Sequence, residues 1–264
     1  MTQDGATVAA RRAGAAFTVT LNRPRRHNCL DLALVEALRG ALAQGAQSDA
    51  AAIILRGAGP SFSSGGDIKA FLAHGADLNA LRGYAHRLVG ALHGLLRDML
   101  ASPLPIIARV QGLATGGALG LVLAADLAAM AEDAFLQPYY GAMGFAPDGG
   151  WTALLPERVG PSRAARVQFL NQRLPAAAAR DLGIVDAVAP EAGLDEVVAG
   201  WLDAIARQDR ASLAATKRLV WDHARLDAIA RRLDAERQAF IELIARPEAQ
   251  RRMADFMACG KARS

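Results

Sequence analysis

Two glycine turns are the stretches of this sequence best suited to chemistry on a carbonyl group. In the first, residues 112–117 follow the β-branched run 106–110 and precede an apolar, helix-compatible run at 118–125. This order predicts a strand, a tight turn and a helix. The first N–H groups of such a helix have no backbone partners and face whatever lies before the helix. The turn is therefore a place to hold negative charge.

The second turn has the same order of elements. Residues 53–55 read as a buried strand, and the run F-S-S-G-G-D-I-K at 62–69 follows it, with Asp67 placed to start a helix. Two strand ends that each deliver an N–H group through a glycine could converge on one oxygen. Such a pair forms an oxyanion hole, in which one donor typically stabilises the transition state by about 3–4 kcal/mol.

Several motifs in order resemble the enoyl-CoA hydratase/isomerase (crotonase) family. They are F-S-S-G-G-D-I-K, V-Q-G-L-A-T-G-G-A-L-G-L-V-L-A-A-D, G-F-A-P-D-G-G, R-V-G-P-S-R-A and A-A-A-A-R-D-L-G-I-V-D-A-V. Pattern alone indicates an α/β fold. The resemblance implies a crotonase-like spiral of repeated strand-strand-helix turns with a C-terminal helical region.

The resemblance also implies a set of site residues. The N–H groups of Gly66 and Gly117 would form the oxyanion hole. The basic loop after the first strand would contact the phosphates of coenzyme A through Arg25, although by itself this loop reads as a solvated basic segment. The remaining substrate-binding residues would be Ser64, Asp67, Ile68 and Tyr140. Coenzyme A would enter only as part of the substrate thioester, with no permanently bound cofactor and no metal.

Hydratases of this family carry two glutamates that handle water and the α-proton, and both are absent here. One would stand at Gly120 and the other at Tyr140 or Tyr139. Asp148, in a P-D-G-G turn before a helix expected near Trp151, is the acid that remains. It could cap that helix, but related isomerases place a proton-shuttling acid at this position. One base without a second acid favours a double-bond shift over addition of water.

Two alternatives use the same residues differently. Asp148 could attack the substrate as a nucleophile, as in the family's aryl-CoA dehalogenases, with Tyr140 as the ring side chain eight residues before it and His93 as the histidine of the long helix. Alternatively, the loss of both glutamates could mark a non-catalytic acyl-CoA-binding protein. A dinucleotide site is excluded because the glycines lack the G-x-G-x-x-G order.

The elements that must position these residues follow from periodicity. We expect a strand at 17–21, a helix at 31–46 capped by Asp31, and a long helix at 76–100. His86 and His93 on that helix have no third ligand nearby, so solvated or packed histidines are expected rather than a metal site. An apolar acyl pocket would be built from segments 71–84 and 139–145.

The C-terminal third is expected to be helical at 194–205, 212–221 and 224–256, after a helix pair at 163–170 and 175–183 and a short strand at 184–188. The domain prediction is a spiral core with the acyl-CoA site at 1–195 and a helical trimerisation or lid region at 196–264. By resemblance, the assembly would be a homotrimer or a dimer of trimers.

Composition narrows the class of protein. The net charge of +4 is spread along the chain, so nucleic acid is not an expected partner. Cys29 and Cys259 have no metal-binding spacing, which suits a reducing compartment. We expect a cytoplasmic enzyme without a membrane span, because no leader layout and no long apolar run is present.

Overall fold

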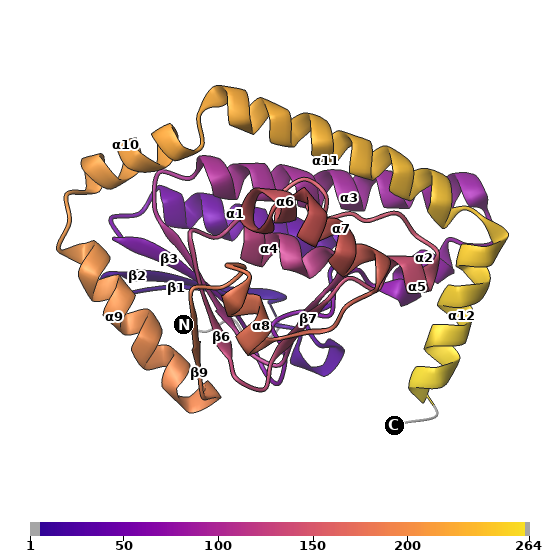
Figure 1. Ribbon diagram of the computed structural model, residues 1–264, viewed down its shortest axis with the longest axis horizontal. Coiled ribbons are helices and arrows are strands. Elements are labelled where there is room, and N and C mark those ends of the chain that lie inside the picture. Colours follow the sequence, from indigo (N-terminus) through magenta and orange to yellow (C-terminus); the bar gives the residue numbers. More distant parts are fainter. Residues whose placement is uncertain (1–5, 262–264) are drawn as a thin grey trace.

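The computed structural model describes residues 6–261 and is built on a six-stranded sheet. Helices surround this sheet (Figure 1). The strand order is β1-β2-β3-β4-β6-β9, and every neighbouring pair except the antiparallel β1 and β2 is parallel. The predicted α/β class is confirmed. The strands are β1 (Val8–Ala13), β2 (Ala16–Leu21), β3 (Ala52–Gly57), β4 (Ile106–Val110), β6 (Leu127–Ala131) and β9 (Ala187–Ala189).

A second, three-stranded sheet has the order β5-β7-β8. Its strands are β5 (Leu113–Thr115), β7 (Phe135–Gln137) and β8 (Leu174–Pro175). The prediction of a plain turn at 112–117 was therefore wrong in part, because three of these residues pair with β7. Two repeats, β4-β5 before α4 (Leu119–Leu123) and β6-β7 before α5 (Tyr140–Met143), send one strand to the large sheet and the next to the small one ahead of the helix.

The first three α-helices begin where side-chain caps satisfy their free N–H groups. Asp31 accepts from Leu34 N at the start of α1 (Leu32–Ala46), and Asp67 accepts from Ala70 N at the start of α2 (Ile68–Ala73). Asp77 caps α3 (Leu78–Ala101). The caps expected at Asp31 and Asp67 are confirmed. Short 3₁₀ helices lie at η1 (Pro24–Arg26), η2 (Gly116–Ala118) and η3 (Glu191–Gly193).

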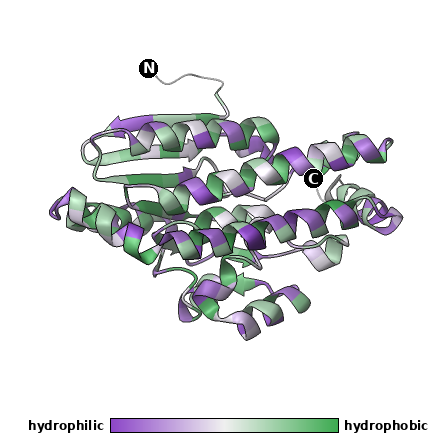
Figure 2. Ribbon diagram, turned by 90° about the horizontal axis from the view of Figure 1, so that it is seen from above, coloured by the Kyte–Doolittle hydropathy of each residue, from purple (hydrophilic) through white to green (hydrophobic). Residues whose placement is uncertain are grey.

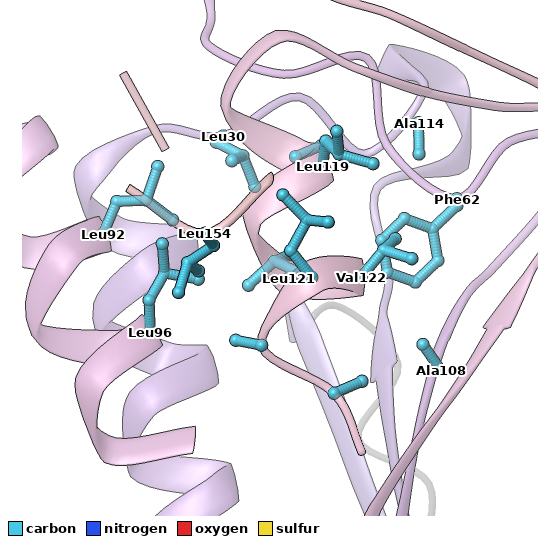
Figure 3. Packing of buried hydrophobic residues seen from close by; sticks show 14 of the residues in the cluster. Leu30, Phe62, Leu92, Leu96, Ala108, Ala114, Leu119, Leu121, Val122 and Leu154 are labelled. Atoms are coloured by element: carbon cyan, nitrogen blue, oxygen red, sulfur yellow. The ribbon is translucent and has the colours of Figure 1, made fainter. Parts of the chain in front are cut away.

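The core lies between the large sheet and helices α1, α3 and α4. Leu119, Leu121 and Val122 of α4 are fully buried and face Leu92 and Leu96 of α3 and Phe62 (Figure 3). The strands of the sheet are predominantly hydrophobic, whereas the surrounding helices alternate between hydrophobic and hydrophilic residues, as amphipathic helices do (Figure 2). The core thus fixes α4, and with it the glycine turn that precedes it.

The middle of the chain contains four short helices. They are α5 (Tyr140–Met143), α6 (Leu155–Val159), α7 (Pro161–Phe169) and α8 (Ala176–Asp181). Gly183, with φ of 75°, ends the last of these, as expected. The helix predicted near Trp151 begins only at Leu155, because residues 149–154 form turns. The strand predicted at 184–188 lies slightly later, at β9.

The C-terminal helices are α9 (Leu194–Ala206), α10 (Arg210–Val220), α11 (His223–Ile244) and α12 (Pro247–Lys261). The prediction of one helix over 224–256 was wrong, because the chain turns after Ile244 and Pro247 starts a new helix. Helix α11 runs along α3 and α12 turns away at its end (Figure 1). Ile229, Leu233, Phe240 and Ile244 of α11 join the same hydrophobic core as the sheet. No helix among residues 6–261 is both long and apolar enough to cross a membrane.

Candidate active site

The two glycine turns lie side by side at the carboxyl ends of β3 and β4. Ser63 N donates to Leu113 O at 3.0 Å, and Thr115 N donates to Ser63 O at 3.1 Å. The contact is so close that a Cβ atom on Gly65 would lie 2.5 Å from Thr115 O. Only glycine fits there. Crevices at this edge of parallel sheets commonly hold ligands.

Both candidate oxyanion donors are available. Leu30 N donates to Gly65 O at 2.7 Å and Asp67 N donates to Leu30 O at 2.9 Å, which fixes the backbone on either side of Gly66. Gly117 is the second residue of η2, where a helix has no internal acceptor for its N–H group. Within the described residues, neither the Gly66 nor the Gly117 N–H group donates a hydrogen bond. Both are free to bind an oxygen.

The Asp148 carboxylate lies against the Gly117 turn. Its Oδ1 would be 3.2 Å from a Cβ atom on Gly117, and the residue is 9% exposed. Tyr140 OH donates to Oδ1 and, at 2.9 Å, to the backbone oxygen of Asp148. The interpretation of Asp148 as a helix cap is wrong, because α6 starts later and has no side-chain cap.

Burial changes the proton affinity of this acid. Desolvation raises the pKa of Asp148 to about 7. The Tyr140 hydrogen bond opposes this rise, and the negative charge of Glu236 adds to it. Burial first, and the Asp148 charge second, raise the pKa of Tyr140 well above its ordinary value, so its phenol keeps the proton it donates. A carboxylate with a pKa near neutrality can both take and return a proton.

Gly117, Gly120 and Gly149 allow the Asp148 turn to dock on the Gly117 turn. A Cβ atom on Gly149 would lie 2.6 Å from Gly117 Cα, and one on Gly120 would lie 2.2 Å from Gly149 O. The buried Trp151 completes the contact through Nε1, which donates to Gly116 O at 2.6 Å. The backbone of Gly149 thus fills the space into which a side chain at position 120 would project.

All eight site residues predicted from the sequence line one cavity of about 530 Å³. The structure brings these residues together on one cavity wall, whereas their roles in binding and catalysis stay predictions. Sequence reasoning missed Phe240, Phe256 and Met257, which reach the cavity from α11 and α12. The spacing of apolar residues in these helices predicted that they pack on another surface, but it did not indicate which surface. The predicted site residues on the cavity wall are Arg25, Ser64, Gly66, Asp67, Ile68, Gly117, Tyr140 and Asp148.

Part of the wall is aromatic. The Phe240 ring lies 5.7 Å from that of Phe71 and 5.3 Å from that of Phe145, measured between centroids. The expectation that residues 71–84 form a pocket loop was wrong: of these, only Phe71 lines the cavity, and the rest belong mainly to helices. Tyr139, Tyr140, Met143 and Phe145 line it as expected. Apolar walls of this type bind apolar groups.

Cationic side chains lie on another part of the same cavity. Arg26 Nη2 contacts Asp67 Oδ2 at 2.5 Å, so this arginine and this carboxylate satisfy each other. Arg25 is exposed and makes no ion pair within the described residues. It is therefore available to an anionic ligand, as is Lys69.

The histidines of α3 do not form a site together. His86 is exposed, whereas His93 is 4% exposed, does not line the cavity and has no hydrogen-bond partner for either ring nitrogen. Burial, with a smaller contribution from Arg237, lowers the pKa of His93 to about 3, so the ring is neutral. No cluster of metal-binding side chains occurs in the described part of the chain.

Cys29 is a buried free thiol on the cavity wall. Burial raises its pKa, so it carries its proton at neutral pH. The side chain of Cys259 lies outside the described residues.

Comparison with known proteins indicates one family for this chain. The family model described as enoyl-CoA hydratase/isomerase matches residues 11–263. The cyclohexa-1,5-dienecarbonyl-CoA hydratase of Thauera aromatica is 33% identical over 239 residues, which are 88% of this chain and 85% of that protein.

Solved structures agree with the predicted fold. An enoyl-CoA hydratase from Bacillus halodurans superposes with a TM-score of 0.89 at 24% identity, over 95% of this chain and 100% of that one, a likeness that concerns the fold alone. An enoyl-CoA hydratase from Mycobacterium avium subsp. paratuberculosis superposes with a TM-score of 0.84 at 28% identity, covering 94% and 98%. The expected crotonase-like architecture is confirmed.

Proposed function

The chain belongs to the enoyl-CoA hydratase/isomerase family, and from that membership we propose that it shifts a double bond in an acyl-CoA thioester through an enolate. The observation that carries this proposal is the Asp148 carboxylate, buried against the Gly117 turn. Asp148 is the acid and base, and the N–H groups of Gly66 and Gly117 hold the thioester oxygen.

The reaction is a balanced transfer of one proton. Asp148 removes a proton from a carbon next to the enoyl or thioester group, and the C–H electron pair moves into the carbon chain as negative charge develops on the thioester oxygen. The two N–H groups stabilise that charge. Asp148, whose proton can exchange with solvent at this stage, then returns one proton to a different carbon, the electrons re-form the carbonyl, and no water is consumed.

The small number of carboxylates on the cavity wall favours this reaction over hydration. Asp67 and Asp148 are the carboxylates among the cavity-lining residues of the described chain, and Asp67 is engaged with Arg26 and with the start of α2. Addition of water in this family uses two free carboxylates, whereas a proton shuttle uses one. The packing of Gly120 against Gly149 leaves no room for the first hydratase glutamate.

The substrate carries coenzyme A as its own thioester, so no bound cofactor is required. We assign the exposed Arg25, with Lys69, to the phosphates, and the aromatic wall to the acyl group. Ser64 and Ile68 flank the glycine turn, and Tyr140 orients Asp148.

We also propose the larger arrangement expected from the family. Residues 1–195 form the spiral core, residues 196–264 form a trimerisation and lid region, and the chain assembles as a homotrimer or a dimer of trimers in the cytoplasm. Phe169, Leu170 and Leu219 support an assembly, because they are 87%, 64% and 79% exposed.

One observation favours the alternative in which Asp148 is a nucleophile. Tyr140, a ring side chain eight positions before Asp148 in the sequence, donates a hydrogen bond to it. This alternative lacks a base for the second step, because His93 lies outside the cavity wall. A non-catalytic binding protein would not need a buried acid beside the Gly117 turn.

A product assay tests the proposal. The protein is incubated with matched 2-enoyl-CoA and 3-enoyl-CoA esters of straight-chain and ring acids, and products are separated by chromatography with mass detection. We expect interconversion of the double-bond isomers at unchanged mass. A product heavier by one water would overturn it in favour of hydration. A single turnover in ¹⁸O-water that labels the Asp148 carboxylate would instead identify a nucleophile.

A further inference from the structure

The turn that follows Asp148 is anchored by a residue from a distant part of the chain. Glu236 of α11 is 4% exposed, and its carboxylate accepts from Gly150 N at 2.8 Å, Thr152 N at 2.6 Å and Ala153 N at 3.0 Å. Thr152 Oγ1 donates to it as well, at 2.6 Å. Burial raises the pKa of Glu236, and the four donors oppose that rise by stabilising the ionised carboxylate. The same four hydrogen bonds hold the turn in place.

We infer that Glu236 is a positioning residue for Asp148: it fixes the turn at 149–153 and places a second negative charge behind the acid. The inference rests on the proposed function, in which Asp148 transfers the proton. Glu236 does not line the cavity and touches no substrate, so its effect passes through the turn and through its charge.

The geometry links this anchor to the oxyanion hole. Gly150 directly follows Gly149, whose backbone packs against Gly117, and Asp148 precedes both. If the anchor is lost, Gly149 is no longer pressed on Gly117, and the distance from the acid to the bound thioester changes. Small displacements of this kind in an active site can cost about a hundred-fold in rate.

The charged and titratable groups around this pair are few. Tyr140 of α5 donates to Asp148, and Glu236 of α11 faces it from behind. His93 of α3 lies 3.8 Å from Glu236 and is neutral, and the charge of Arg237 adds to the effect of burial in lowering the pKa of His93. Among residues 6–261, no lysine or arginine forms an ion pair with Glu236, and the charge of Glu236 raises the pKa of Asp148.

The test compares four full-length proteins: wild type, Glu236→Gln, Thr152→Val and Glu242→Gln. Thr152→Val removes one donor to Glu236 and keeps the charge. Glu242 is an exposed carboxylate on the same helix and serves as the matched control. The first readout is the ¹³C NMR titration of the Asp148 carboxyl in the free protein, assigned by its loss in Asp148→Asn. The second readout is the pH profile of α-proton exchange.

In Glu236→Gln we expect the Asp148 titration and the acidic limb of exchange to move to lower pH, with kcat reduced by as much as about a hundred-fold and KM changed little. In Thr152→Val we expect a reduced kcat with the titration unmoved, and in Glu242→Gln no change. A folded Glu236→Gln protein whose Asp148 titrates as in wild type would overturn the inference. If Glu236→Gln does not fold, a wild-type kcat in Thr152→Val overturns the positioning role.

The two proposals fail separately. If the NMR titration moves as expected but the wild type exchanges no α-proton, the proposed function is wrong and the coupling of Glu236 to Asp148 holds. If the wild type exchanges protons and the Asp148 titration does not move in Glu236→Gln, the proposed function holds and the coupling of Glu236 to Asp148 is wrong.

Discussion

Gly120 and Gly149 are in direct backbone contact: a Cβ atom on Gly120 would lie 2.2 Å from the Gly149 carbonyl oxygen and 2.8 Å from Leu96 Cδ1. Position 120, where the resemblance predicts a glutamate in hydratases, is therefore sterically closed here. Glycine at position 120 and the docking of the Asp148 turn belong to the same packing arrangement.

Substitution of Gly120 should damage the site rather than restore a hydratase. We expect Gly120→Ala to lower the free energy of unfolding by about 1–3 kcal/mol, because the added methyl group overlaps backbone atoms. Gly120→Glu should cost more and yield no hydration product. Denaturant unfolding and the product assay measure both effects. Gly40→Ala, at an open position of α1, is the control, and should raise stability by up to about 1 kcal/mol. A stable Gly120→Glu protein that hydrates enoyl-CoA would contradict this.

Removal of the Tyr140 hydroxyl should move the pH profile upward. Its hydrogen bond lowers the pKa of Asp148 against the larger effect of burial. Tyr140→Phe therefore raises that pKa further, and the acidic limb of the rate profile, which reports deprotonation of the base, moves to higher pH. Tyr139→Phe is the matched control, because Tyr139 lines the same cavity without donating to Asp148. An acidic limb that stays in place or moves down in Tyr140→Phe would show that another group is titrating.

Asp148 should also make stability depend on pH. Its pKa is about 7 in the folded chain and 3.8 in the absence of burial, so the folded state holds a proton that the unfolded state releases. Stability from this group is present below about pH 4 and is lost as pH rises toward 7, at about 1.4 kcal/mol per unit. We expect the difference in unfolding free energy between wild type and Asp148→Asn to fall by a few kcal/mol over this range. A difference that is flat with pH would mean that Asp148 is ionised throughout.

Sequence reasoning worked where the signal was local. Glycine turns after apolar strands, and aspartates before apolar runs, act through their own backbone, so the glycine turns at Gly66 and Gly117 and the caps at Asp31 and Asp67 were predictable. Strand β1 was missed, because it is an exposed edge strand whose arginines give no apolar alternation.

Long-range contacts were beyond such reasoning. Glu236 is 88 residues from Asp148 in the numbering and reads as one more charge on an amphipathic helix. Phe240 likewise reads as a core residue, and only folding shows that its ring meets Phe71 at the cavity. The extra strand β5 was hidden inside a glycine-rich segment, since its pairing with β7 depends on residues about twenty positions away.

Arg25 should contribute to binding and not to chemistry. We expect Arg25→Ala to raise KM for CoA thioesters by about ten-fold, with kcat unchanged, because a charge-assisted contact to phosphate is lost. The effect should shrink at high salt. N-acetylcysteamine thioesters, which lack the phosphates, are the control and should be used equally well by both proteins. An equal rise in KM for both kinds of thioester in Arg25→Ala would show that Arg25 does not act through the phosphates.

The most direct measurement of the central claim is α-proton exchange. Wild type, Asp148→Asn and the control Glu242→Gln are incubated with acyl-CoA esters in deuterated buffer, and deuterium uptake is followed by mass spectrometry. The account predicts uptake by wild type and Glu242→Gln and a loss of at least about a hundred-fold in Asp148→Asn, as expected when an acid-base group is removed. Uptake that survives in Asp148→Asn would contradict the assignment of Asp148 as the base.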